Sequence, residues 1–243
     1  MDTLTISAAG GMRARMESLD MLANNLSNTE TGGYKTDREF YNLYVSAEAS
    51  GRQDASAATL PVIERPWTDF SQGTLRETGS PSDLALSGRG FFAVDGPSGS
   101  LFTRNGSFRV SPGGALVTPE GYAVRTVSGA NLAVQPSGDL EVAPDGTVSQ
   151  SGQVLGQIEI ADFSDTGSLV KQGASYFRSA AASQPASGAV VEQGKLESSN
   201  VGAAESAVRL VAVMRQFEML QKAATLGSQM NREAVEEVAR VAS

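Results

Sequence analysis

The chain has 243 residues and a formal net charge of −8, and it contains 26 glycines but neither histidine nor cysteine. This acidity argues against nucleic acid as a partner, and the missing residue types exclude Ser-His-Asp and Cys-His nucleophiles, thiolate zinc sites and imidazole metal ligands. We therefore expect no metal and no cofactor, and the catalytic arrangement that stays open is a carboxylate pair such as Asp83 and Asp95.

The N-terminal stretch MDTLTISAAGGMRARM lacks the basic head and long apolar core of a Sec-type signal peptide. No stretch of the chain approaches the ~18 apolar residues of a membrane-spanning helix. On these two rules alone, a cytoplasmic protein without membrane insertion is expected.

The first predicted element is a helix from Thr3 to about Asn28. Apolar residues recur along it at helical spacing, namely Met12, Met16, Leu19, Leu22, Ala23 and Leu26. Gly10 and Gly11 weaken its first turns or mark a place where another backbone comes close. The following stretch, LANNLSNTETGGYK, is rich in Asn, Ser and Thr, which compete for backbone hydrogen bonds, and it contains two glycines. We expect the helix to end there.

Low-complexity stretches at 47–60 and 180–189 flank a region of period-two patterning, and we interpret them as hinges or loops. Within the region, LFTRNGSFRV predicts a hairpin over Leu101–Val110 with a type I′ turn at Asn105-Gly106. Residues 91–94 and 153–163 are typical of buried or half-buried strands. Turn signals come at Pro112-Gly113-Gly114, Pro119-Glu120-Gly121, Pro144-Asp145-Gly146 and Ser151-Gly152.

A second, longer helix is predicted from about Ala203 to Val241. Its apolar stripe contains Leu210, Val213, Met214, Phe217, Leu220 and Ala224, and continues through Met230, Ala234, Val238 and Val241. Acid-first pairs four residues apart support the helix, for example Glu205 with Arg209 and Glu218 with Lys222.

The predicted fold class is α+β, with two long terminal helices packed together in a coiled-coil-like manner and an all-β domain inserted between them. The expected domains are a terminal helical domain at 1–34 and 200–243, a connecting region at 35–75 and 180–199, and a β-rich domain at 76–179. One helix pair leaves apolar surface exposed, so we expect it to meet other copies or other proteins. The alternative, in which both helices fold back over the β region, stays open.

Four motifs in this order resemble the axial proteins of the bacterial flagellum, which form its rod, hook and hook-associated parts. LANNLSNTETGGYK is similar to the rod signature, and TGSPSDLALSGRGFFAV and LFTRNGSF are similar to blocks of the rod proteins. KLESSNVGAAESAVRLVAVMRQFEMLQKA is similar to their C-terminal block, although Gly202 and Ala203 depart from it. Within the family, RQFEM and the chain length favour the proximal rod type over the distal rod type.

The resemblance implies a structural, torque-transmitting rod subunit without enzymatic activity. It implies export through the flagellar type III apparatus without a cleaved signal, and assembly with copies of itself and other rod proteins into a helical shaft in the periplasm. The terminal helices would form the inner tube, with the β domain facing outward. The expected assembly contacts are Asn24, Asn25, Leu26, Asn28, Leu210, Met214, Phe217, Met219 and Leu220. A remote alternative is a peptidoglycan hydrolase that uses Asp83 or Asp95.

Overall fold

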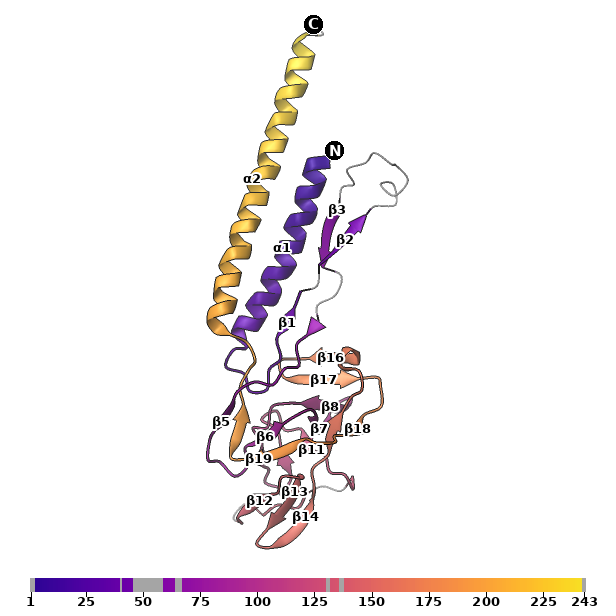
Figure 1. Ribbon diagram of the computed structural model, residues 1–243, viewed down its shortest axis with the longest axis vertical. Helices are drawn as coiled ribbons and strands as arrows, with labels where there is room; N and C mark the ends of the chain where they lie inside the picture. The colour runs from indigo at the N-terminus through magenta and orange to yellow at the C-terminus, as the bar shows by residue number, and fades with distance from the viewer. Residues whose placement is uncertain are drawn as a thin grey trace. The chain divides into compact units, whose positions relative to one another are not determined.

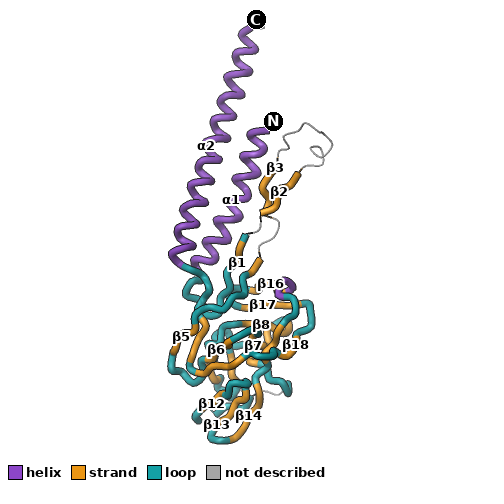
Figure 2. Tube along the Cα trace, viewed as in Figure 1, coloured by secondary structure: helices purple, strands orange, loops and turns teal. Residues whose placement is uncertain are grey.

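The computed structural model describes residues 3–39, 41–45, 59–63, 67–129, 132–135 and 138–241, and it has mixed helix and strand content, as an α+β chain does (Figures 1 and 2). The chain divides into two compact units. The helical unit contains residues 1–27, 37–67 and 202–243, and the strand unit contains residues 28–36 and 68–201. The domain limits expected above stay a prediction, and most of the predicted hinge at 47–60 lies outside the described residues.

The helical unit is built on α1 (Thr3–Ser27) and α2 (Ala203–Val241), so both predicted helices are confirmed. They are about 38 and 58 Å long at 1.5 Å per residue, and they contact each other while running in opposite directions (Figure 1). The unit also contains the pair β2 (Tyr41–Val45) and β3 (Thr59–Ile63), of which β3 contacts α1. Two short strands, β1 (Asp37–Arg38) and β4 (Trp67–Thr68), pair beside the unit boundary.

The strand unit contains the rest of the described strands. These are β5 (Leu75–Glu77), β6 (Leu84–Ser87), β7 (Phe91–Gly96), β8 (Gly99–Thr103), β9 (Arg109–Val110), β10 (Leu116–Val117), β11 (Ala123–Val124), β12 (Leu140–Val142), β13 (Thr147–Gln150), β14 (Gln153–Gln157), β15 (Ile160–Asp162), β16 (Leu169–Gln172), β17 (Tyr176–Ser179), β18 (Gln184–Pro185), β19 (Val190–Gln193) and β20 (Lys195–Glu197). A 3-10 turn, η1 (Thr166–Ser168), precedes β16.

The main sheet has the order β16-β17-β8-β7-β11-β10-β9, and β15 pairs with both β7 and β18. Three smaller sheets accompany it: β12-β13-β14, β19-β6 and β20-β5. The β20-β5 pair, in which Leu196 lies opposite Arg76, joins the end of the unit to its beginning. The chain therefore returns beside its own start before it leaves for α2.

Strand β7 lies at the centre of the core and is buried on both faces. Phe92 and Val94 belong to the larger cluster of buried side chains, together with Leu84, Phe108 and others. Phe91 and Ala93 point to the opposite face and belong to a second, aromatic cluster that includes Phe163 and Phe177. This two-sided burial explains why the predicted strand at 91–94 is continuously apolar rather than alternating.

The four predicted turns are confirmed, because each lies at a reversal between two consecutive paired strands. Gly114 and Gly121 have φ of 79° and 94° at the turns before β10 and β11. Gly146 and Gly152 have φ of 84° and 78° at the turns on either side of β13. Glycine adopts a positive φ at little cost, so the chain can reverse direction at these positions, and the strands end there. The predicted strand at 153–163 is present as two strands, β14 and β15.

The predicted hairpin over Leu101–Val110 is wrong. Strand β8 pairs with β7 and β17, whereas β9 pairs with β10. The Asn105 carboxamide accepts a hydrogen bond from the backbone NH of Ser107 (3.1 Å), and Gly106 lies directly against the backbone of Leu84. The Asn-Gly pair therefore lies in a loop between β8 and β9 that packs against β6 instead of forming a local turn. We call residues 104–108 the crossing loop.

Candidate functional site

One face of α2 is covered by α1. The described side chains on this face repeat at alternating spacings of three and four, and they are Leu210, Val213, Phe217, Leu220 and Ala224. Val213 is buried, and the Leu220 side chain lies over Gly11, where an added Cβ would be 3.2 Å from Leu220 Cδ1. Leu210, Phe217 and Leu220, three of the expected assembly contacts, are therefore half-buried within the chain.

The face of α1 that is buried differs from the stripe expected from the sequence. Its buried side chains are mostly small, namely Ala8, Ala14, Ser18, Leu22 and Asn25, with Gly11 among them. Of the expected stripe, Leu22 alone is buried, while Met16 is 55% exposed and Met12, Leu19 and Leu26 are half-buried. Small residues allow the two helix axes to approach closely, which a search for large apolar side chains does not detect.

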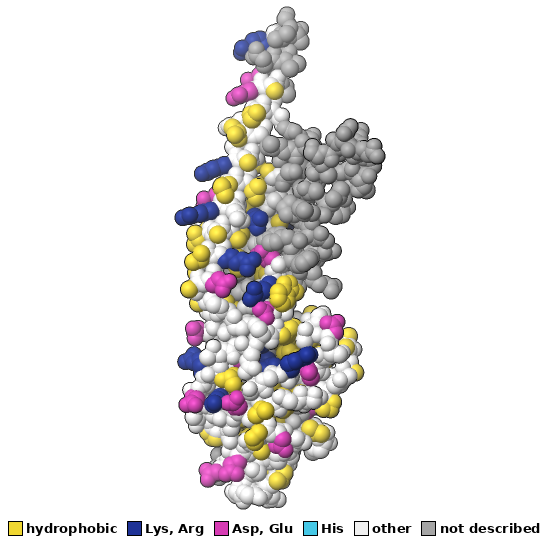
Figure 3. Space-filling model, viewed as in Figure 1, with side chains coloured by type: hydrophobic (Ala, Val, Ile, Leu, Met, Phe, Trp, Pro, Cys, Tyr) yellow, Lys and Arg dark blue, Asp and Glu magenta, His cyan; other side chains and the backbone are white. Residues whose placement is uncertain are grey.

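A second apolar face of α2 is exposed. Val208, Met219 and Met230 follow one another at intervals of 11 residues and are 72%, 61% and 62% exposed. Ala212, Ala223 and Leu226 lie on the same side of the helix and are also exposed, and Figure 3 shows hydrophobic side chains along the exposed length of α2. An 11-residue repeat keeps one face of a helix continuous. We call Val208, Ala212, Met219, Ala223, Leu226 and Met230 the outer stripe.

The other expected assembly contacts fall into separate environments. Met219 belongs to the outer stripe, whereas Met214 is exposed one turn after Leu210, at the edge of the face that α1 covers. Asn24 is exposed in the last turn of α1, and Asn28 forms a turn in which its Oδ1 accepts a hydrogen bond from Thr31 Oγ1 (3.0 Å). Whether these residues contact another copy stays a prediction.

Asn25 is committed to a contact inside the helical unit. It is 2% exposed; its Nδ2 donates to the carbonyl of Asp37 (2.8 Å), and its Oδ1 accepts from the NH of the same residue (3.1 Å). A carboxamide that binds both the NH and the C=O of one residue makes the same two hydrogen bonds that a neighbouring β-strand would make. In this chain the second Asn of the rod signature therefore fastens the end of α1 to β1.

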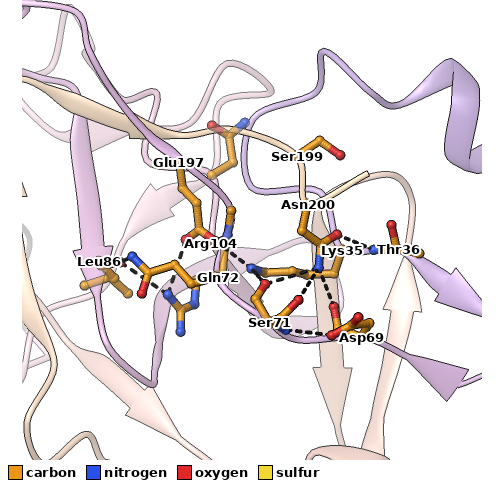
Figure 4. Close-up of polar contacts among 12 residues, drawn as sticks. Lys35, Thr36, Asp69, Ser71, Gln72, Leu86, Arg104, Glu197, Ser199 and Asn200 are labelled. Carbon is orange, nitrogen blue, oxygen red and sulfur yellow. Dashed lines mark hydrogen bonds and ion pairs between the residues drawn. The ribbon is translucent and has the colours of Figure 1, made fainter. Parts of the chain in front are cut away.

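Three of the sequence motifs meet in a buried ionic cluster of the strand unit (Figure 4). Lys35 ends the motif TGGYK, Arg104 lies in LFTRNGSF, and Glu197 lies in KLESSN. Lys35 Nζ is 2.5 Å from Glu197 Oε1, and Arg104 Nη1 is 3.2 Å from Glu197 Oε2. Lys35 and Glu197 are fully buried and Arg104 nearly so. We call Lys35, Arg104 and Glu197 the ionic triad.

Polar atoms of the surrounding backbone also bind the triad, although Arg104 Nε is buried without a hydrogen-bond partner. Glu197 Oε1 also accepts from the NH of Gly73 (2.9 Å), and Lys35 Nζ also donates to the carbonyl of Ser71 (2.7 Å). Arg104 donates to the carbonyls of Leu86 (3.3 Å) and Gly88 (2.6 Å). Burial lowers the pKa of Lys35 and of Arg104, and the charge of Glu197 opposes the shift in both.

The segments that carry the triad are also joined through their backbones. The NH of Gly33 donates to the carbonyl of Glu197 (2.7 Å), and the NH of Thr36 donates to Asn200 Oδ1 (2.8 Å). Gly33 has φ of 66°, and a Cβ there would overlap the backbone of Arg104 and Asn105. The second glycine of the signature is thus required both by its conformation and by its close neighbours.

All three motifs are visible in the sequence, but the sequence does not show that they meet. A partial signal was available, since Lys35 and Arg104 each stand as the one charged residue of TGGYK and LFTRNGSF, among small, polar or apolar neighbours. Charged residues are rarely buried unless they are paired, so such positions predict partners in one another. Nothing in the spacing indicates which motif meets which, because Lys35 and Glu197 are 162 residues apart.

The candidate catalytic acids occupy ordinary environments. The carboxylate of Asp95, at the end of β7, is largely exposed and lies 3.9 Å from Arg125 Nε. Asp83 precedes β6 and forms an isolated bridge with Ser107. Within the described ranges, no helix is long and apolar enough to span a bilayer, and no group of acidic side chains is placed to hold a metal ion.

Long helices come before and after the strand unit in the sequence, and α2 carries an exposed apolar stripe. These features are typical of a subunit that assembles with other proteins. The comparisons with known proteins agree. Residues 85–156 match the family described as the flagellar hook protein FlgE/F/G D1 domain. Residues 192–237 match the family described as the flagellar basal body rod FlgEFG protein C-terminal. The second match contains most of α2 and, just before it, Glu197 of the triad.

Relatives that match over most of their length identify the family more specifically than the two domain matches do. The chain is 30% identical to the flagellar basal-body rod protein FlgF of Caulobacter vibrioides over 243 residues, which cover 99% of both chains. It is 31% identical to FlgF of Mesorhizobium japonicum, with 89% of each chain covered. It is also 31% identical to FlgG of Caulobacter vibrioides, with 92% of this chain and 95% of that one covered. The chain belongs to the flagellar basal-body rod protein family, a family of structural proteins of the bacterial motility apparatus.

Proposed function

We propose that this chain is a subunit of the proximal rod, of the FlgF type, and that it acts as a structural, torque-transmitting element without catalytic activity. The observation that carries the choice is one relative, FlgF of Caulobacter vibrioides, which matches over 99% of both chains; FlgF of Mesorhizobium japonicum covers 89% of the chain and the FlgG relatives cover 90–94%. The block Arg215-Gln216-Phe217-Glu218-Met219 favours the same type. The distal rod type, FlgG, is the alternative.

The proposal includes the mode of assembly. The inner faces of α1 and α2 pack in a coiled-coil-like pair, and the outer stripe of α2 meets helices of other copies or of other rod proteins. An apolar stripe at helical spacing favours a helix as its partner. Where the outer stripe meets a different surface of the next copy, the contacts are head-to-tail, and repeated head-to-tail contacts build an open helical filament.

The proposal also places the protein along the rod in the periplasm, after export through the flagellar type III apparatus without a cleaved signal. One feature supports this route. A chain without cysteine forms no disulfide that would obstruct threading in an oxidising compartment.

The test is to delete the gene for this chain in its own host and to complement it with a chain that carries a small tag in the exposed turn at Ser151-Gly152. We expect the deletion to abolish motility and rod assembly, and the tagged chain to restore both. Cryo-electron tomography of basal bodies should then place the tag at the proximal part of the rod. A tag at the distal part would assign the chain to the FlgG type, and motile deletion cells would overturn the rod function itself.

A further inference from the structure

The ionic triad lies where both ends of the strand unit meet. Lys35 is one residue from the end of segment 28–36, which follows α1 in the chain, and Glu197 is four residues from Val201, after which the chain enters the helical unit again. We call residues 28–36 the N-connector and residues 195–201 the C-connector. Each connector supplies one of the two fully buried charges, Lys35 and Glu197, that form the closest ion pair of the triad.

The two buried charges depend on each other unequally. Without the N-connector, Glu197 keeps Arg104 and the NH of Gly73 but loses Lys35, the nearer of its two cations. Without Glu197, the buried cations of Lys35 and Arg104 keep hydrogen bonds to backbone carbonyls only, and the charges of Asp69 and Asp162 act on them more weakly than Glu197 does. Losing a partner in a buried ionic cluster is far more costly than losing an exposed pair.

Further hydrogen bonds join the two connectors. The NH of Asn200 donates to the carbonyl of Tyr34 (3.3 Å), and the Asn200 carboxamide joins the NH of Thr36 (2.8 Å) to the carbonyl of Asp69 (2.8 Å). Tyr34 itself is buried, and Lys171 Nζ lies 4.1 Å from the centroid of its ring. Most of what holds the N-connector is therefore contributed by, or shared with, the C-connector.

We propose that the ionic triad is a coincidence latch: the N-connector docks stably on the strand unit only when the C-connector is docked, and the reverse. A chain that is still incomplete, or one whose end is held by another protein, keeps both connectors open. The latch thereby makes the docking of both connectors depend on a complete and released chain. This inference does not rest on the position of the protein in the rod.

The test is hydrogen–deuterium exchange on the purified full-length chain, read at hydrogen-bonded amides of each connector. Lys35→Met alters the N-connector and leaves Glu197 paired with Arg104, and we expect exchange to accelerate about tenfold or more in the C-connector, at Ser198 and Asn200. Glu197→Gln alters the C-connector and leaves two buried cations without their shared carboxylate, so it should accelerate Gly33 and Tyr34 more strongly, about a hundredfold or more. Amides of the β7–β8 pairing, such as that of Phe102, should keep their protection.

The matched control is Lys195→Met, which removes a half-buried lysine of the same C-connector, paired with Glu192 (2.8 Å), and should leave exchange at Gly33 unchanged. Asn200→Ala provides a milder variant that keeps all three charges paired. It should accelerate the amide of Thr36 about tenfold. The latch is overturned if Lys35→Met accelerates exchange in the N-connector alone, or if β7 and β8 lose protection as strongly as the connectors do.

Discussion

Glycines of the strand unit differ in what an added methyl group would meet, and this difference can be measured. A Cβ at Gly106 would overlap the carbonyl oxygen of Leu84 and approach the ring of Phe92, whereas at Gly113 the nearest atom, Ser111 Oγ, is 3.9 Å away. We expect Gly106→Ala to lower the free energy of unfolding by about 2–3 kcal/mol, since the buried loop must shift. Gly113→Ala should change it by less than about 1 kcal/mol. Urea unfolding of the two variants tests this, and equal effects would contradict the role assigned to the crossing loop.

Tyr176 makes the strand unit sensitive to alkaline pH. Burial, and then the hydrogen bond that its hydroxyl donates to Glu120, raise the pKa of this phenol above its usual value. A raised pKa means that the folded chain holds the proton more tightly. The resulting stabilisation is complete below the unfolded-state pKa of about 10, and it is lost as the pH rises from there toward the folded-state pKa.

Tyr176 alone should therefore reduce the free energy of unfolding by about 1.4 kcal/mol per pH unit above about pH 10. Urea unfolding between pH 8 and pH 11 measures this slope. Tyr176→Phe has no phenol to ionise and should show a correspondingly shallower slope. The same slope in both chains would mean that another group is responsible.

At the scale of whole elements, the outer stripe of α2 can be tested apart from the helix itself. Met219→Glu places a charge in the middle of the exposed stripe, and Gln221→Glu places the same charge at an exposed position of the same helix outside the stripe. Sedimentation velocity over a range of concentrations should show that Met219→Glu abolishes self-association, while Gln221→Glu associates as the parent chain does. Circular dichroism should report the same helix content in all three chains, because both substitutions are at exposed positions. Unchanged association of Met219→Glu would exclude the outer stripe as the contact surface.

The elements of this fold differ in how far the sequence alone predicts them. Both helices and all four glycine turns follow from local chemistry. A turn at a glycine such as Gly146 needs a positive φ, which glycine adopts without help from distant residues. The Asn105-Gly106 hairpin does not form, because the packing of Gly106 against Leu84 is a tertiary contact that no local pattern contains. The buried face of α1 was misassigned for a related reason: Gly11 and Ala14 are buried because they are small, whereas apolar periodicity gives weight to large side chains such as Met16.

At the scale of the whole molecule, the ionic triad is the part of the candidate site that the sequence could not reveal. Lys35, Arg104 and Glu197 are conspicuous individually, but only the topology brings them together, because β20 returns beside β5 and so carries Glu197 to the start of the unit. The sequence predicts that the first 34 residues and the residues from 200 onward act as one helical domain, and this stays a prediction. The division of the structure into two compact units groups residues 28–36 with the strands.

This boundary leads to a prediction for fragments. A chain of residues 28–201 contains the whole strand unit, including the N-connector and the triad, whereas a chain of residues 37–201 lacks Gly33, Tyr34 and Lys35. The shorter fragment loses a fully buried side chain, Tyr34, and one partner of the buried ion pair. Each of these losses costs about 3–5 kcal/mol, which together approach the full stability of a domain of this size.

We therefore expect the fragment 28–201 to unfold cooperatively on heating and to keep the circular dichroism of a β protein, since α1 and α2 are absent from it. The fragment 37–201 should be largely unfolded or aggregated under the same conditions. Lys35→Met in the longer fragment separates the two contributions, because it removes the ion pair and keeps Tyr34, and it should lie between the two fragments in stability. If 37–201 proves as stable as 28–201, the segment after α1 is dispensable for the strand unit, and the chain should instead be divided at the limits expected from its sequence.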